Sequence, residues 1–304
     1  MTCRFATSLI LAVSLAAAGT RPARSASLYV ADAQTATVVR FLLRQDIPQP
    51  QPAGTLQLGN VPTHIAVGPP GFLFVSYAKQ PVVDVFASQA RGRAVPLRVL
   101  ALAKPPTAIA VDSAGYLYLA GVERGVIDIY APGASGRAGP TARVVAPNTS
   151  TITFVALDPQ GRLFFVNSNE GVPTLLEYAD PLTNPTFVRL IGFGALVSAT
   201  AIDVMHEAYV ITGSTGNAGS IGAYSPSACC AGYPVDRTIA PLRQTFVPVA
   251  IAIRNRYAFV ASGSVAQPGS SLVDTFDLFG GTQRPLAVIA GSFLPLPVAI
   301  AVDL

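Results

Sequence analysis

The 304-residue sequence predicts an all-β protein, built as a ring of six four-stranded antiparallel sheets. Three observations support this prediction. A unit of four short apolar runs separated by turn residues recurs along the chain, a small residue recurs at one position of each copy, and the two ends of the chain complete each other. Runs of about five residues separated by turns are typical of antiparallel meanders.

The clearest copy of the unit spans residues 106–146. Its apolar runs, named strands a to d, lie at 107–111, 116–120, 126–131 and 141–145. Residues 112–115, Asp-Ser-Ala-Gly, separate strands a and b. An aspartate that accepts bonds from its own backbone and a glycine that tolerates positive φ favour a tight turn there.

The start of strand b sets the period of the repeat. Strand b begins at Leu28, Leu73, Leu117, Leu163, Ala208 and Ala258, so successive copies are 45, 44, 46, 45 and 50 residues apart. A four-stranded unit of this length is typical of a β-propeller blade. The sequence therefore predicts one domain, a six-bladed β-propeller over residues 27–304.

A small residue occupies the second position of every predicted strand a. These residues are Ala66, Ala110, Ala156, Ala201, Ala252 and Ala301. In a propeller the innermost strands converge on the axis, and a small side chain fits where the blades come closest.

The two ends of the chain complement each other. The first copy begins at strand b, at 27–32, and lacks a strand a, whereas residues 297–304 read as a strand a with nothing after it. We expect the last strand to pair with strand b of the first blade. This pairing closes the ring and removes exposed sheet edges that invite aggregation.

Three segments of the clearest copy resemble the NHL-type repeat of secreted bacterial propellers. They are Pro-Thr-Ala-Ile-Ala-Val-Asp at 106–112, Gly-Tyr-Leu-Tyr at 115–118 and Ile-Tyr-Ala at 129–131. The resemblance covers roughly residues 27–304 and is strongest in blades two and three. It implies the architecture but no single activity, because propellers of this type include lactonases, lyases and many binding proteins.

The first 26 residues predict a secretory signal peptide. Arg4 precedes an apolar run at 9–18, which small residues follow. This run is too short to span a membrane, so we expect a secreted or periplasmic protein without a membrane span. Removing residues 1–26, which contain Arg4, Arg21 and Arg24, lowers the formal charge from +4 to +1, because 17 Lys and Arg remain against 16 Asp and Glu. A nearly neutral chain argues against a nucleic-acid partner.

Polar residues of the b–c loops, with a histidine that opens strand a of blade two, are the candidate ligand contacts. Propellers bind many ligands on the face formed by the b–c and d–a loops, so we expect these side chains to form a polar rim there. The candidates are His64, Tyr77, Lys79, Glu123, Arg124, Asn167, Asn169 and Glu170. The alternative is ordinary loop polarity, with His64 as a hydrogen-bonded surface residue.

Two cysteines, Cys229 and Cys230, are adjacent in the c–d region of blade five. In an oxidising compartment they can form a vicinal disulfide, bridge to another chain, or remain thiols without a role. The two histidines beyond the predicted signal, His64 and His206, are expected on opposite faces of the ring. They therefore do not make a shared zinc site.

Aspartates recur at the predicted end of strand a. These residues are Asp112, Asp158, Asp203 and Asp303. A metal site is one interpretation of such a series, but their position in the a–b turn favours local capping of the turn backbone.

Two hypotheses of function follow. The first is a non-enzymatic propeller, most simply a monomer without a cofactor, that binds a protein, glycan or cell-envelope partner through its loop face. The second is a hydrolase or lyase that resembles the gluconolactonase and virginiamycin B lyase propellers. That resemblance implies a divalent cation in the channel, held by Glu123, Asn167, Glu170 and His64.

Overall fold

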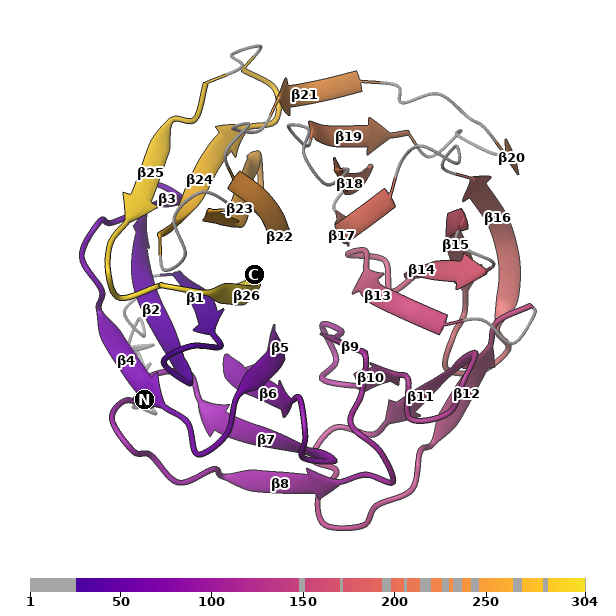
Figure 1. The fold of residues 1–304 in the computed structure, drawn as a ribbon. Helices are drawn as coiled ribbons and strands as arrows, with labels where there is room; N and C mark the ends of the chain where they lie inside the picture. Colours follow the sequence, from indigo (N-terminus) through magenta and orange to yellow (C-terminus); the bar gives the residue numbers. More distant parts are fainter. Residues whose placement is uncertain are drawn as a thin grey trace, which may run out of the picture.

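The computed structural model describes residues 26–147, 151–169, 172–192, 198–204, 207–213, 220–225, 230–231, 237–241, 246–264, 270–280 and 284–303. They form six antiparallel sheets arranged around a central axis (Figure 1), which confirms the six-bladed β-propeller. Within the described part of the chain, no helix is long and apolar enough to cross a membrane.

The blades follow one another along the chain, with strand a innermost. Blade two contains β5 (Pro62–Gly68), β6 (Phe72–Tyr77), β7 (Val82–Ala87) and β8 (Arg98–Ala101). Blade three contains β9 (Ala108–Val111), β10 (Leu117–Ala120), β11 (Val126–Tyr130) and β12 (Ala142–Val145). Blade four contains β13 (Thr151–Leu157), β14 (Leu163–Asn169), β15 (Val172–Ala179) and β16 (Thr186–Gly192).

The remaining three blades include the one that joins the two ends. Blade five contains β17 (Ser198–Val204), β18 (Ala208–Gly213), β19 (Ser220–Tyr224) and β21 (Arg237–Pro241). Blade six contains β22 (Phe246–Arg254), β23 (Tyr257–Ser264), β24 (Ser271–Asp277) and β25 (Ala287–Ala290). Blade one combines β26 (Pro297–Val302) with β1 (Ser27–Asp32), β2 (Thr37–Arg44), β3 (Ile47–Pro48) and β4 (Gly54–Gln57).

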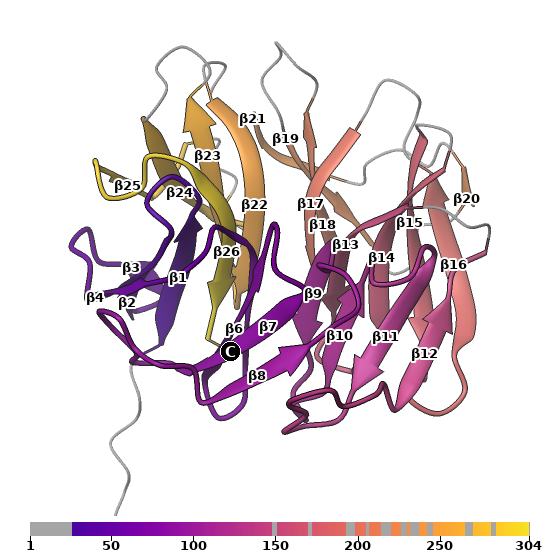
Figure 2. The ribbon, with the colours of Figure 1, turned by 60° about the horizontal axis from the view of Figure 1, so that its bottom comes forward.

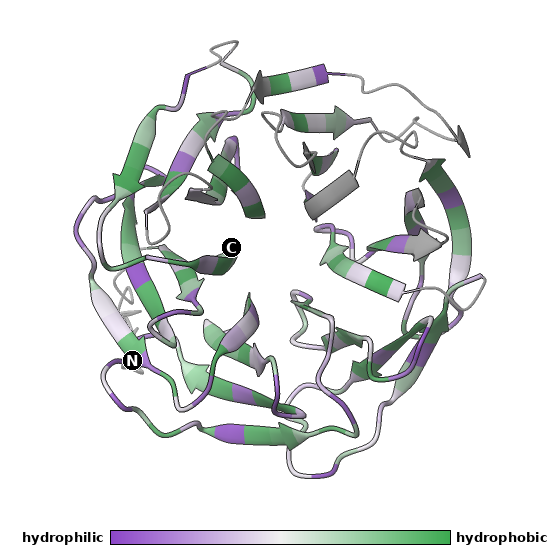
Figure 3. Ribbon diagram, viewed as in Figure 1, coloured by the Kyte–Doolittle hydropathy of each residue, from purple (hydrophilic) through white to green (hydrophobic). Residues whose placement is uncertain are grey.

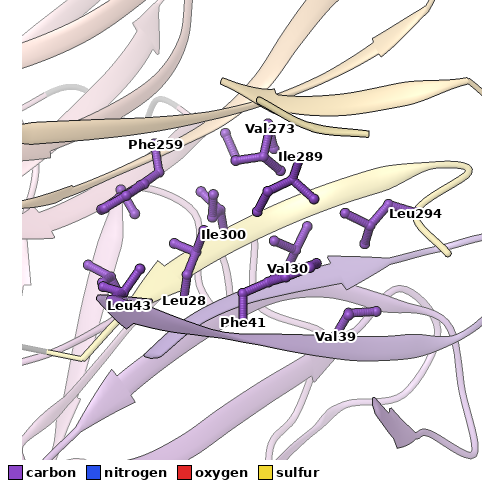
Figure 4. Packing of buried hydrophobic residues seen from close by; sticks show 14 residues of the cluster. Leu28, Val30, Val39, Phe41, Leu43, Phe259, Val273, Ile289, Leu294 and Ile300 are labelled. Atoms are coloured by element: carbon purple, nitrogen blue, oxygen red, sulfur yellow. The ribbon is translucent and has the colours of Figure 1, made fainter. Parts of the chain in front are cut away.

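The last strand closes the ring as the sequence predicts. Strand β26 pairs with β1 in an antiparallel register that places Leu28 opposite Val302 and Val30 opposite Ile300. Ile300 lies among Leu28, Phe41 and Phe259 (Figure 4), so the closing strand also joins the core between blades one and six. Further hydrogen bonds reinforce the join, since the Leu296 backbone N–H donates to Asp32 Oδ2 at 2.6 Å and the Ala33 N–H donates to Leu296 O at 2.9 Å.

Each sheet buries both of its faces against its neighbours. The buried apolar residues form six clusters, each shared between two adjacent blades. Along β10, Tyr118 and Ala120 pack toward blade four, whereas Leu117 and Leu119 pack toward blade two. Strands covered on both sides read as nearly continuous apolar runs, which explains the hydrophobic strands in Figure 3 and the 51% hydrophobic composition.

Several outer edges are covered from the following blade. The c–d loop of blade two reaches β4, where the Gly92 N–H donates to Thr55 O at 2.8 Å and the Gly92 carbonyl oxygen accepts from the Gln57 N–H at 2.7 Å. Gly136 of blade three makes the same two bonds to the β8 edge, and β20 (Cys230–Ala231) of blade five pairs in parallel with β16. Gly92 and Gly136 have φ of 60° and 62°, a conformation that glycine adopts without strain.

The closing strand gives a direct test of ring stability. Ile300→Ala should lower the free energy of unfolding by about 2–5 kcal/mol, because it opens a cavity between blades one and six. Val288→Ala, on the exposed side of β25, should change it by less than about 0.5 kcal/mol. Urea unfolding of both variants checks this, and equal losses would contradict a role for β26 in the core.

Candidate functional site

A cavity of about 480 Å³ lies on the axis of the ring, at the end where strand a meets the a–b turn. Six aliphatic residues, one from each innermost strand, surround it at equivalent positions: Val67, Val111, Leu157, Val204, Ile253 and Val302. The six innermost strands encircle the axis in Figure 1, and the end of β26, marked C, lies on the lower side of the ring in Figure 2. Most of the cavity wall is therefore aliphatic, and polar side chains such as Asp112, Asp158 and Asp203 complete it.

In five of the blades the small residue of strand a lies opposite a large aromatic residue of strand b. In register, Ala66 lies opposite Phe74, Ala110 opposite Tyr118, Ala156 opposite Phe164, Ala252 opposite Phe259 and Ala301 opposite Tyr29. All five alanines also line the cavity. The expected small position is confirmed in these five blades.

Blade five departs from this pattern, and here the prediction from sequence is wrong. Ala201 pairs with Ile211, and the residue opposite the strand b aromatic, Tyr209, is Asp203. Only three residues separate Val204 from Ala208 in this hairpin, whereas five separate Val111 from Leu117. The shorter turn moves Asp203 out of the turn and into β17, where it lines the axial cavity.

The carboxyl group of Asp203 bridges two innermost strands. Its Oδ1 accepts a hydrogen bond from Val204 N–H at 2.6 Å, and its Oδ2 accepts one from Ile253 N–H of β22 at 2.5 Å. Burial raises the pKa of Asp203 to about 7, although the two backbone bonds favour the charged form. Asp203 therefore joins blades five and six rather than capping a turn.

Two other aspartates cap their turns as expected. Asp112 Oδ1 accepts from Ala114 N–H at 2.9 Å and Tyr116 N–H at 2.8 Å. Asp158 Oδ1 makes the equivalent pair of bonds, and its Oδ2 accepts from Arg162 Nε at 2.6 Å. Both lie at the mouth of the cavity with Arg254, whose Nε donates to Asp46 Oδ1 at 2.8 Å. Asp303 follows β26, and its backbone oxygen accepts from Arg254 Nη1.

Two of the predicted contact residues, Tyr77 and His64, lie in strands of blade two rather than in its loops. Tyr77 is 2% exposed and its hydroxyl donates to Asp84 Oδ2 at 2.7 Å, so Tyr77 does not contribute to a polar rim. His64 lies in β5, and its Nδ1 has no hydrogen-bond partner among the described residues. Burial lowers the pKa of His64 to about 4, which leaves the imidazole neutral at pH 7.

The described candidates of blades three and four make no hydrogen bond or ion pair with Tyr77 or His64. Glu123 is exposed and pairs with Arg143 at 3.2 Å, while Arg124 and Lys79 are exposed loop residues. Asn167 is buried in β14, and its Oδ1 has no partner within the described ranges. The hydrogen bond of Tyr77 and the ion pair of Glu123 thus stay within single blades.

Some predicted site residues lie outside the part of the chain that the structure describes. Glu170, His206 and Cys229 are outside it, and for Asn169 and Cys230 only the backbone is described. The vicinal disulfide therefore stays a prediction. Among the residues that are described, no group of three or more His, Cys, Asp or Glu side chains could hold a metal ion.

Comparison with known proteins supports the fold alone. No family model and no curated protein matches the chain. A protein of unknown function from Bacteroides caccae matches with a TM-score of 0.63 at 10% identity, over 92% of this chain and 99% of its own. A protein from Lactobacillus plantarum matches with a TM-score of 0.56 at 12% identity, over the same shares. The NHL-type identity of the repeats stays a prediction.

The internal bond of Tyr77 can be tested by removing one hydroxyl. Tyr77→Phe should lower the free energy of unfolding by about 1–3 kcal/mol, because it leaves the partly buried Asp84 carboxyl without its donor. Tyr116→Phe, at a partly exposed position, should change it by less than about 0.5 kcal/mol. Chemical denaturation of the two variants measures the difference. If Tyr77→Phe lowered the free energy of unfolding no more than Tyr116→Phe does, the result would contradict this role of the Tyr77 hydroxyl.

Asp203 gives a prediction for the pH dependence of stability. Its pKa of about 7 in the folded state exceeds the roughly 3.9 of an unfolded chain, so the native state binds more protons between these values. The contribution of Asp203 to stability therefore falls as the pH rises from about 4 to 7. The stability of Asp203→Asn relative to the wild type should rise across this window and stay level above it. Urea unfolding at several pH values checks this, and a difference independent of pH would contradict it.

Proposed function

We propose that this chain is a binding propeller that holds a small, largely apolar ligand in the axial cavity at its a–b turn face. The observation that carries the proposal is the ring of six aliphatic side chains, one from each blade, around a cavity of about 480 Å³. Ligand pockets are usually apolar and measure roughly 300–1,000 Å³, with few polar groups that fix the orientation of the ligand. Burial of apolar groups contributes roughly 0.8 kcal/mol per CH₂.

The proposed ligand site opens on the a–b turn face of the ring, opposite to the loop face that we expected from the sequence. The sequence favoured the b–c and d–a loop face, whereas the aliphatic cavity reaches the face of the a–b turns, where Asp112, Ser113, Asp158, Arg254 and Asn255 surround it. The polar atoms of Asp112 and Asp158 are held by their own turns, and Arg254 pairs with Asp46. The mouth is thus a rigid polar border around an apolar interior.

The proposal includes no catalytic residue and no cofactor. The cation-dependent alternative requires oxygen ligands from several blades around one point. Its described members, His64, Glu123 and Asn167, lie in β5, the b–c loop of blade three and β14, and no observation favours them as a set. We further propose that the ligand is met outside the cytoplasm, since Arg4 and the apolar run at 9–18 have the pattern of a secretory signal.

A bulky residue at the mouth tests the site. N-Phenyl-1-naphthylamine, a neutral apolar probe, should bind the wild type with increased fluorescence. Ser113→Trp should weaken binding by about tenfold or more, because Ser113 is exposed and borders the cavity, whereas Trp fills its mouth.

Ala114→Trp is the matched control. Ala114 is the next residue of the same exposed turn and does not line the cavity, so binding should stay within about twofold of the wild type. Equal binding by all three proteins, or no binding by the wild type, would overturn the axial site.

A further inference from the structure

Asp203 is the one carboxylate at a position where the other five blades have alanine. In register it corresponds to Ala66, Ala110, Ala156, Ala252 and Ala301, and like them it lines the axial cavity. The aliphatic residues Ile202 and Val204 lie on either side of it along β17. Asp203 thus places an acidic group among the aliphatic residues of the innermost strands, in addition to Asp112 and Asp158 at the mouth.

The surroundings of Asp203 leave its charge uncompensated within the described chain. Its hydrogen-bond partners are the backbone N–H groups of Val204 and Ile253, one on each oxygen. A carboxylate has about four acceptor positions, so acceptor capacity remains.

The nearby cations are held by other acids. Arg254, on the adjacent β22, binds Asp46, and Arg237 binds Glu207 at 2.8 Å beside β18. Asp158, at the end of β13, is paired with Arg162. None of these arginines forms an ion pair with Asp203 in the described structure. The cavity mouth therefore offers acids rather than a free cation, which disfavours an anionic ligand.

Burying a carboxylate without a cation is costly, and the raised pKa of Asp203 reflects this cost. A ligand cation inside the cavity would offset it, since charge-assisted hydrogen bonds are strong where water is excluded. The bond to Ile253 N–H gives Asp203 a structural role as well. That role alone does not depend on the head group of a ligand, so the two roles can be separated by experiment.

We propose that the axial cavity binds an organic amine, with its ammonium group on the Asp203 carboxylate and its apolar part against the aliphatic ring. This inference rests on the proposed function and specifies the ligand class of the same site. The fit is complementary in both parts: one acceptor group for the head, and six aliphatic side chains for the body.

Three six-carbon compounds with the same tail test the head group: hexylammonium, hexanol and hexanoate. Their affinities are measured by displacement of N-phenyl-1-naphthylamine and by calorimetry at pH 8. Hexylammonium should bind about tenfold or more tightly than hexanol, and hexanoate should bind most weakly.

In Asp203→Asn the amine should lose this preference, to within about twofold of hexanol, while hexanol keeps its wild-type affinity. Asp180→Asn, at an exposed position that does not line the cavity, should retain the wild-type preference. If Asp203→Asn fails to fold, the comparison of head groups in the wild type still decides the question.

The failures of the two proposals are distinguishable. Equal wild-type affinities for hexylammonium and hexanol, or an amine preference that survives in Asp203→Asn, would overturn the amine assignment and leave the axial site intact. Failure of all three compounds and of the probe to bind the wild type would overturn the axial site itself.

Discussion

Each blade of this protein has two apolar faces, and both are buried only by contact with the neighbouring blades. Each of the six buried clusters is shared by two neighbouring blades, so every sheet depends on the one before and the one after it. An open array would leave two such faces in water. The pairing of β26 with β1 removes both at once, and it brings Ile300 and Val302 into the last cluster. The stability of the whole ring is therefore tied to its closing strand.

The architecture could be predicted from the sequence because it repeats. Three features recur in the copies: a turn aspartate, a small residue in strand a and an aromatic residue in strand b. The strand assignment of each copy therefore supports the strand assignments of the others. The bounds expected for blade three, 107–111 and 116–120 among them, agree with β9 and β10 to within one residue. The complementary ends likewise sufficed to predict closure, because one strand is missing at one end and one is extra at the other.

The acidic residue of the candidate site could not be predicted in the same way, because Asp203 lies where the repeat is broken. Asp203 follows Ile202 as Asp112 follows Val111, so the sequence pattern assigns it to a turn. The hairpin of blade five is two residues shorter than that of blade three, which moves Asp203 to the position opposite Tyr209. Alignment of the copies on the aromatic residue of strand b, with the length of each a–b turn counted, would have indicated this position of Asp203. Tyr77 was misplaced for another reason: its polar atom is used inside its own blade, by Asp84.

The loops at Gly92 and Gly136 have a consequence for how blades can be added to such a ring. Each loop belongs to one blade and covers the outer strand of the blade before it. Duplication of four strands together with their c–d loop therefore also duplicates the segment that covers the outer strand of the preceding blade. The c–d loop of a duplicated unit inserted between two blades would cover the outer strand of the preceding blade. The c–d loop of the following blade would cover the outer strand of the duplicated unit. Modular duplication of this kind would lengthen the chain without exposing a new edge at the rim.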